Sequence, residues 1–153
     1  MHASPQQTVQ GTLARMDEGW TAFRGQVHSL RGELLEVRLG EGTWTRKQML
    51  AHIGTWHDLT VDRLSRFAES DEPVELSEET DVINARSARA AGGRTTGEIL
   101  LTIDDSYRRL RRQVGLLTDA QLLAHEGWAA AVIAANTYDH YAEHLPDLDA
   151  KGA

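Results

Sequence analysis

Three histidines in this chain have the residue type and the spacing to bind one metal ion. His140 and His144 lie four residues apart, so on an α-helix their imidazoles project from one face, one turn apart. His52 lies beside Met49 and Ile53, on the apolar stripe of another predicted helix. Three such imidazoles would form a tripod with metal–nitrogen distances of about 2.0–2.1 Å and at least one open coordination position, as in catalytic sites.

The spacing by itself leaves two interpretations open. With seven histidines in 153 residues, a pair at this spacing arises by chance in about one chain in three, so the pair alone is a weak signal. Buried imidazoles can also be ordinary core or cleft residues that are satisfied by hydrogen bonds. If a metal binds, the all-imidazole ligand set suits zinc, nickel, iron or copper and does not select among them.

Residues one helical turn from these histidines are candidates for the pocket wall or for contacts that orient the ligands. Trp56 can pack in the core or form a wall of the pocket. Asn136 can hold an imidazole N–H or satisfy a backbone group. Tyr141 can donate its phenol to a substrate or lie partly buried.

His57 is the remaining candidate for a catalytic role. It follows His52 by five residues, which is about 140° around a helix, so we expect a position at the surface or at the rim of the pocket. A histidine at the pocket mouth can transfer protons.

The apolar residues that carry these candidates recur at helical spacing and predict an all-α protein. Capping boxes at Thr45 with Gln48, and at Thr95 with Glu98, mark two helix starts. The stretch 32–42 can be a short helix or extended, Thr118 begins a short turn, and 69–94 is a long connection, either functional or mobile. Four amphipathic helices with one long crossover predict a four-helix bundle, up-down in order and formed as one domain by residues 1–153; the helices are expected at about 8–28, 45–68, 95–117 and 129–144.

Composition narrows the function classes. Cysteine is absent, which excludes disulfides, zinc ribbons, iron–sulfur clusters and a cysteine nucleophile, so thiol chemistry would need an external low-molecular-weight thiol. Acidic residues outnumber basic ones 23 to 16, and the net charge of −7 disfavours nucleic acid as a partner. The start MHASPQQ does not resemble a signal peptide, and no apolar run is long enough for a membrane span. We therefore expect a cytoplasmic protein with a small-molecule substrate.

Two segments resemble the DinB-like superfamily of four-helix proteins: TWTRKQMLAHIGTWHDLTVDRL (43–64) and VIAANTYDHYAEHLPDL (132–148). That superfamily includes thiol-dependent transferases and mycothiol-dependent maleylpyruvate isomerases. Its recurring metal ligands are one histidine in the second helix and an H-x-x-x-H pair in the fourth, which correspond here to His52, His140 and His144. The resemblance implies a bundle that holds a divalent metal, and superfamily members are often homodimers.

Within the superfamily, AHIGTWHDL and the N-T-Y-x-H-Y stretch look closest to the ClbS/DfsB branch. That branch includes a cyclopropane hydrolase that confers self-resistance to a genotoxin, and it is not defined by metal use. Two functions therefore remain open. The first is a metal-dependent hydrolase or thiol transferase that acts on a small electrophile. The second is a self-resistance protein that binds or hydrolyses a reactive natural product without metal. A structural dimer module with a vestigial site is a third possibility.

Overall fold

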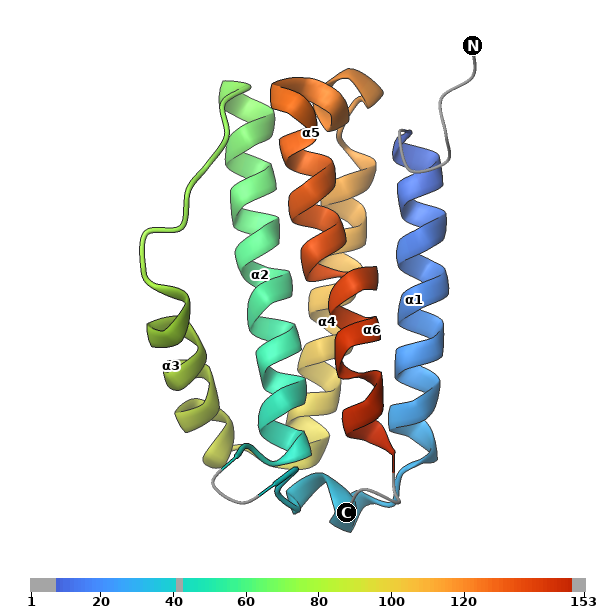
Figure 1. The fold of residues 1–153 in the computed structure, drawn as a ribbon, viewed down its shortest axis with the longest axis vertical. Helices are drawn as coiled ribbons and strands as arrows, with labels where there is room; N and C mark the ends of the chain where they lie inside the picture. Colours follow the sequence, from blue (N-terminus) through green and yellow to red (C-terminus); the bar gives the residue numbers. More distant parts are fainter. Residues whose placement is uncertain (1–7, 41–42, 150–153) are drawn as a thin grey trace.

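The computed structural model describes residues 8–40 and 43–149 and shows an all-α bundle (Figure 1). The prediction of the fold class is confirmed. The bundle consists of three long helices and a fourth rod made of two consecutive helices, with one more helix on the outside. These elements are α1 (Val9–Ser29), α2 (Arg46–Ser70), α4 (Thr96–Gly115), the rod of α5 (Asp119–Asn136) and α6 (Tyr138–His144), and the outer helix α3 (Thr80–Gly92).

Consecutive helices are joined end to end, except that the chain returns along the outside of the bundle between α2 and α4. In Figure 1 the chain runs down α1, up α2, back down along α3, up α4, and down through α5 and α6. As a result α2 and α4 run parallel and pack against each other, while α3 lies against α2. Part of the stretch 69–94, which was expected to be a long connection, either functional or mobile, forms the helix α3. Within 8–40 and 43–149, no helix is both long and apolar enough to cross a membrane.

Threonines set the starts of four helices. Each one accepts a hydrogen bond from the backbone N–H three residues on, which satisfies one of the free donors at a helix start. The capping boxes predicted at Thr45 and Thr95 are confirmed, and Thr118 forms a third with Gln121. The threonine caps are Thr8, Thr45, Thr95 and Thr118.

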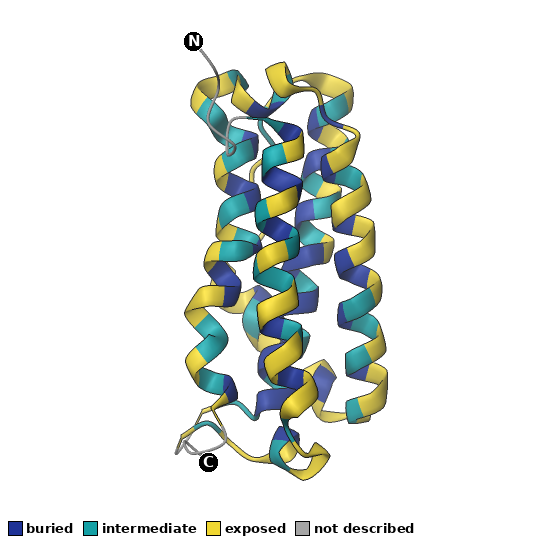
Figure 2. Ribbon diagram, turned by 90° about the vertical axis from the view of Figure 1, so that its right-hand side faces the viewer, coloured by how far each residue is buried: buried dark blue, intermediate teal, exposed yellow. Residues whose placement is uncertain are grey.

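Apolar stripes on the inner faces form one continuous core, seen as the buried bands in Figure 2. The apolar stripe of α1 is buried, except that Trp20 is only partly covered. Its other members are Leu13, Met16, Phe23 and Val27. Trp20 stacks on Tyr107 of α4, with ring centroids 4.6 Å apart. Each large side chain taken fully out of water contributes about 1.5–3 kcal/mol, so these stripes supply most of the stability. Fully buried members include Met16, Phe23, Leu50, Leu64, Phe67, Ile103, Leu110 and Ile133.

A buried arginine ties the start of α2 to the end of the chain. Arg46 is 1% exposed and donates to three backbone carbonyls, those of Leu34 at 3.2 Å, Asp147 at 2.8 Å and Asp149 at 3.0 Å. The first carbonyl belongs to the 3₁₀ helix η2 (Gly32–Glu36), and the Asp147 carbonyl to η3 (Leu145–Leu148). Arg46 therefore fixes the segment that follows α6.

The turn expected at Thr118 is helical from Asp119 up to a kink, where His125, Glu126 and Gly127 all take positive φ. The last predicted helix, 129–144, begins after this kink as expected, but it is not continuous. It is interrupted at Thr137, with φ −127° and ψ −108°, and resumes as α6. The break lies three residues before His140, so the two helices of this rod need not share one axis.

One glycine allows α6 to approach α1. A Cβ on Gly19 would lie 3.1 Å from Cβ of Tyr138 and 3.2 Å from its Cα, which is too close for any larger residue without a shift. The stretch left open at 32–42 contains η2, followed by an isolated bridge between Arg38 and Thr45. Residues 41–42 and the start MHASPQQ, on which two expectations depended, lie outside the described residues.

Candidate metal centre

The three histidines named from the sequence come together between α2 and α6. Nε2 of His52 lies 2.9 Å from Nε2 of His140, and the three ring centroids are 4.8, 5.3 and 4.9 Å apart. One nitrogen from each ring, with His144 as the third, lies within 4.8 Å of the other two. Nitrogens that share an ion at about 2.0–2.1 Å span at most about 4.2 Å, so a small ring rotation closes the site.

Burial keeps two of these imidazoles neutral. His52 and His140 are each 8% exposed. Burial, with the neighbouring His144, lowers the pKa of His52 to about 4. Burial, with His52 and then His144 nearby, lowers the pKa of His140 to about 3. A neutral imidazole offers a lone pair, which is the form that binds a metal.

The hydrogen-bond partner of His52 determines where its proton lies. Oδ1 of Asn84, in α3, accepts from the indole N–H of Trp56 at 2.8 Å and lies 3.1 Å from Nδ1 of His52. Because the same oxygen serves as acceptor for both, the proton of His52 lies on Nδ1, and its Nε2 lone pair faces His140. An orienting partner on the other ring nitrogen is typical of metal-binding histidines.

His144 has a comparable partner. Its Nδ1 lies 2.8 Å from Oδ2 of Asp147, and its side chain is 17% exposed. A carboxylate is an acceptor, so this contact also places the proton on Nδ1 and leaves Nε2 free. The backbone of Asp147 is held by Arg46, so the carboxylate is presented from a fixed segment.

His140 differs from the other two. Its Nδ1 is the buried side-chain nitrogen or oxygen that lacks a hydrogen-bond partner, within the part of the chain that the structure describes. Its remaining nitrogen is the one that faces His52. A buried polar atom without a partner costs about 1–3 kcal/mol of stability. Such atoms are rare in folded proteins, and those that occur are often found at functional sites.

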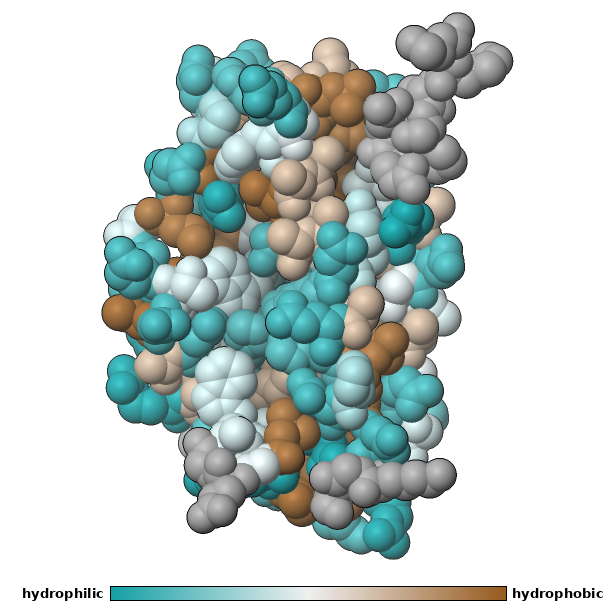
Figure 3. Space-filling model, in the orientation of Figure 1, coloured by the Kyte–Doolittle hydropathy of each residue, from teal (hydrophilic) through white to brown (hydrophobic). Residues whose placement is uncertain are grey.

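A cleft of about 420 Å³ opens over the three histidines. Trp44 and Trp56 contribute indoles to its lining, and the centroid of the Trp44 ring system lies 5.2 Å from that of His52. Hydrophilic side chains gather across the middle of the face shown in Figure 3. The cleft is lined by Trp44, His52, Trp56, Thr80, Asn84, Ala135, Asn136, His140, Glu143 and His144.

The other sequence candidates fall in different places. Trp56 lies in the wall of the cleft, where it both packs and donates to Asn84. Asn136 also lines the cleft, but its amide nitrogen donates to the carbonyl of Val132 at 2.8 Å. Tyr141, expected near the pocket, is fully buried and does not line the cleft.

The expected surface or rim position of His57 is wrong. His57 is 0% exposed, and both ring nitrogens are engaged: Nδ1 lies 2.8 Å from Oγ of Ser106, and Nε2 lies 2.6 Å from Oη of Tyr141. Ser106 in turn donates to the carbonyl of Ile103 at 3.0 Å. Since this hydroxyl proton is used, Nδ1 of His57 donates to Ser106 and Nε2 accepts from Tyr141. The prediction is wrong because α4 packs over the side of α2 that carries His57 and buries this residue.

Burial lowers the pKa of His57 to about 3 and raises the pKa of Tyr141, so the pair is neutral at physiological pH. The pair of Ser106 and His57 has the residue types of a hydrolytic dyad. Both are fully buried, however, and all their polar atoms are used in this network. The network therefore supports the core behind the cleft.

Sequence reasoning missed several residues of the cleft and its supports. Asn84 carries no local signal, because it lies in the stretch expected to be a connection. Asp147 could have been found, since it follows His144 by three residues. Trp44 and Glu143 line the cleft and had been given no part in it.

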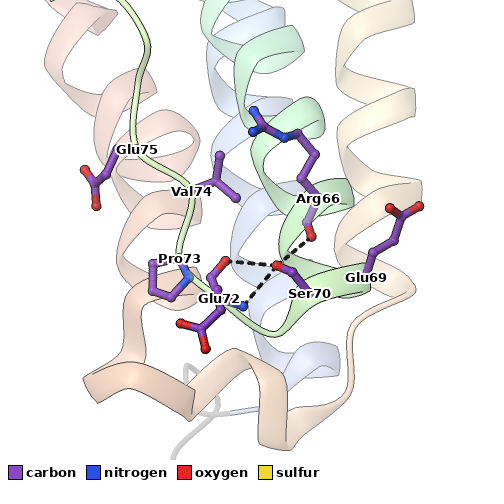
Figure 4. Close-up of a pocket in the computed structure, with 7 residues that line it drawn as sticks. All are labelled: Arg66, Glu69, Ser70, Glu72, Pro73, Val74 and Glu75. Carbon is purple, nitrogen blue, oxygen red and sulfur yellow. Dashed lines mark hydrogen bonds between the residues drawn. The ribbon is translucent and has the colours of Figure 1, made fainter.

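A second hollow lies at the carboxyl end of α2 and carries no comparable chemistry (Figure 4). Its lining is acidic, with one arginine and no histidine, and Ser70 in its floor bonds to the backbone of Arg66 and Glu72. The lining residues are Arg66, Glu69, Ser70, Glu72, Pro73, Val74 and Glu75.

The comparisons with known proteins agree with the bundle. A family model described as the DinB superfamily matches residues 15–146, a range that contains all three histidines. No curated protein and no solved structure matches the chain.

Proposed function

The chain belongs to the DinB superfamily, and on that premise we propose that it holds a divalent metal ion and acts on a small electrophilic molecule. The observation that carries the proposal is the convergence of His52, His140 and His144 beneath an open cleft. A divalent ion requires imidazole lone pairs that can reach one point, and burial keeps His52 and His140 in the neutral form that offers them. Zinc, nickel and iron all accept such ligands.

The chain's own residues have separate parts in this proposal. His52, His140 and His144 would hold the ion, while Asn84 and Asp147 keep two of the rings in the correct tautomer. When bound, the ion supplies a Lewis acid that polarises a substrate or increases the acidity of a nucleophile. The indoles of Trp44 and Trp56 in the cleft wall favour a flat or apolar group next to the histidines.

Two reaction classes fit this arrangement, hydrolysis and transfer of a thiol. The chain contains no cysteine, so in the second class the nucleophile is an external low-molecular-weight thiol. In either class the substrate is a small molecule that enters from the open side of the cleft.

A panel of electrophiles tests the proposal, each assayed with and without a low-molecular-weight thiol. The protein is used in a metal-loaded and in a chelator-treated form. Turnover that disappears on chelation and returns with metal supports the proposal, and its dependence on thiol separates transferase from hydrolase. Turnover that survives complete removal of metal contradicts it, and favours a metal-free protein of the ClbS/DfsB kind. Homodimer formation stays a prediction, which light scattering checks.

A further inference from the structure

We infer that Asn84 is a positioning residue that fixes the tautomer of His52, so that the crossover helix α3 completes the centre formed by α2 and α6. The inference rests on the proposed function, because the tautomer of His52 decides whether its Nε2 can offer a lone pair to a metal. It is carried by the contacts of one amide oxygen, and these can be tested in the metal-free protein.

The indole of Trp56 decides which way the Asn84 amide points. An indole N–H can only donate, so the amide atom 2.8 Å from it must be the oxygen and not the nitrogen. The same oxygen lies 3.1 Å from Nδ1 of His52. If that nitrogen carried a lone pair, two acceptors would face each other in a partly buried place. Nδ1 therefore carries the proton, and Nε2 of His52 carries the lone pair.

This assignment determines what His52 presents to the cluster. With the proton on Nδ1, the Nε2 atom that lies 2.9 Å from His140 is an acceptor. With the opposite tautomer, a hydrogen would occupy the space between the two rings and the nitrogen could not act as a ligand. The indole N–H of Trp56 thus fixes the Asn84 oxygen as the acceptor for Nδ1 of His52. That contact in turn leaves the lone pair on the metal-facing Nε2.

Asn84 is held in place by contacts that do not involve His52. One turn further along α3, Oγ of Ser87 lies 2.8 Å from Oγ1 of Thr55 in α2. The side-chain amide of Gln48 donates to the carbonyl of Ala88 at 3.1 Å. These bonds dock α3 on α2 whether or not a metal is present, so the acceptor oxygen is already in position before an ion arrives.

The direct test is the tautomer of His52 in metal-free protein, read from the ¹⁵N shifts of the imidazole nitrogens at pH 8. We expect the wild type to show a protonated Nδ1 and an unprotonated Nε2. Asn84→Leu keeps the size of the side chain but removes the acceptor, so His52 becomes a mixture of tautomers. Asn84→Asp keeps an acceptor oxygen and restores the wild-type signature. Trp56→Phe frees the Asn84 amide to rotate and moves His52 toward a mixture, which provides a second variant if Asn84→Leu does not fold.

Zinc affinity provides the second measurement. Loss of a partner that orients a ligand weakens metal binding by about 10- to 100-fold, and we expect that loss for Asn84→Leu and not for Asn84→Asp. Ser87→Ala is the matched control, because it removes a bond between α2 and α3 without touching the acceptor of His52. We expect it to bind zinc within about threefold of wild type, in contrast to the larger loss for a removed ligand partner.

Two results would overturn the inference. One is a folded Asn84→Leu protein, or Trp56→Phe in its place, whose His52 keeps the wild-type tautomer. The other is an equal loss of zinc affinity in Asn84→Leu and Ser87→Ala, which would mean that docking of α3 matters and the acceptor does not. A wild type that binds no metal contradicts the proposed function instead, while the tautomer result still decides the role of Asn84.

Discussion

Nε2 of His52 lies 2.9 Å from Nε2 of His140, although 88 positions separate the two residues in the chain. Because the proton of His52 is held on Nδ1 by Asn84, this short contact has two chemical explanations. His140 donates its own N–H to the lone pair of His52, or both lone pairs point at one cation. Both explanations leave Nδ1 of His140 buried without a partner, so hydrogen bonding within the protein does not fully satisfy this pair.

The support given to His144 leads to a first prediction. Asp147→Ala removes the acceptor of the His144 Nδ1–H, 2.8 Å away, and we expect zinc affinity to fall by about 10- to 100-fold. Asp139→Ala is the control, since it removes an equal charge from an exposed position of α6 that does not line the cleft. Titration calorimetry of both variants checks this. Equal affinity in Asp147→Ala and wild type would show that the carboxylate does not orient the ligand.

A second prediction concerns the network behind the cleft. Tyr141→Phe removes the hydroxyl that donates to Nε2 of His57 and leaves that nitrogen buried and unpaired. We expect the free energy of unfolding to fall by about 1–3 kcal/mol. Tyr138→Phe is the matched control and should change stability little, since that ring is only partly buried and packs beside Arg15. Urea unfolding measures both, and an unchanged midpoint for Tyr141→Phe would contradict the network.

A third prediction is the pH dependence of stability in chelated protein. Burial lowers the pKa of His57 to about 3, whereas an unfolded histidine titrates near 6.5. Between these values the unfolded chain binds a proton that the folded chain does not, so the free energy of unfolding falls as pH falls from about 6.5 toward 3. At pH 5 the contribution of His57 is about 2 kcal/mol smaller than at pH 7.5.

His52 and His140 act in the same direction, because their pKa values are lowered to about 4 and about 3. Urea midpoints at pH 7.5 and pH 5 test the dependence in wild type and in His57→Gln. We expect a clear loss of stability at pH 5 in the wild type and a smaller loss in the variant. A wild type that is equally stable at both values would mean that these histidines are not buried as neutral groups.

Much of the bundle follows from local signals in the sequence. The apolar stripe of α1 and the capping boxes at Thr45 and Thr95 predict three helix starts within a residue or two, because caps and periodicity act within a few turns of chain. The same signals bring His52, His140 and His144 to inward faces. Their meeting point depends on how the rod of α5 and α6 is placed beside α2, which spacing alone does not specify.

The errors arise where tertiary contacts decide. The stretch 69–94 is poor in apolar residues, and α3 forms within it because Ile83 and Ala91 are buried and polar side chains bond to α2. His57 was expected at a surface because its angle was measured from His52 alone. In the structure α2 is covered on more than one side, by α4 as well as by α5 and α3. A helix buried on several faces has no single exposed stripe from which a rim position can be inferred.

The support residues show the limit of spacing arguments most clearly. Asp147 lies close to His144 in the chain, but its place is fixed by Arg46, which is 101 positions away. Asn84 reaches His52 across 32 positions. Neither the contact between Arg46 and Asp147 nor the contact between Asn84 and His52 leaves a local pattern in the sequence. The first depends on how the chain end folds against α2, and the second on how the crossover helix packs.

Metal content is the most direct test of the central claim. Protein prepared without an affinity tag is incubated with zinc, nickel or ferrous iron, freed of excess ion and subjected to elemental analysis, alongside His140→Ala and the control His28→Ala. His28 is exposed and does not line the cleft, so its loss leaves the cluster intact. We predict close to one ion per chain in wild type and His28→Ala, and a marked loss in His140→Ala. Wild-type protein that retains no ion after loading with any of the three metals would contradict the account.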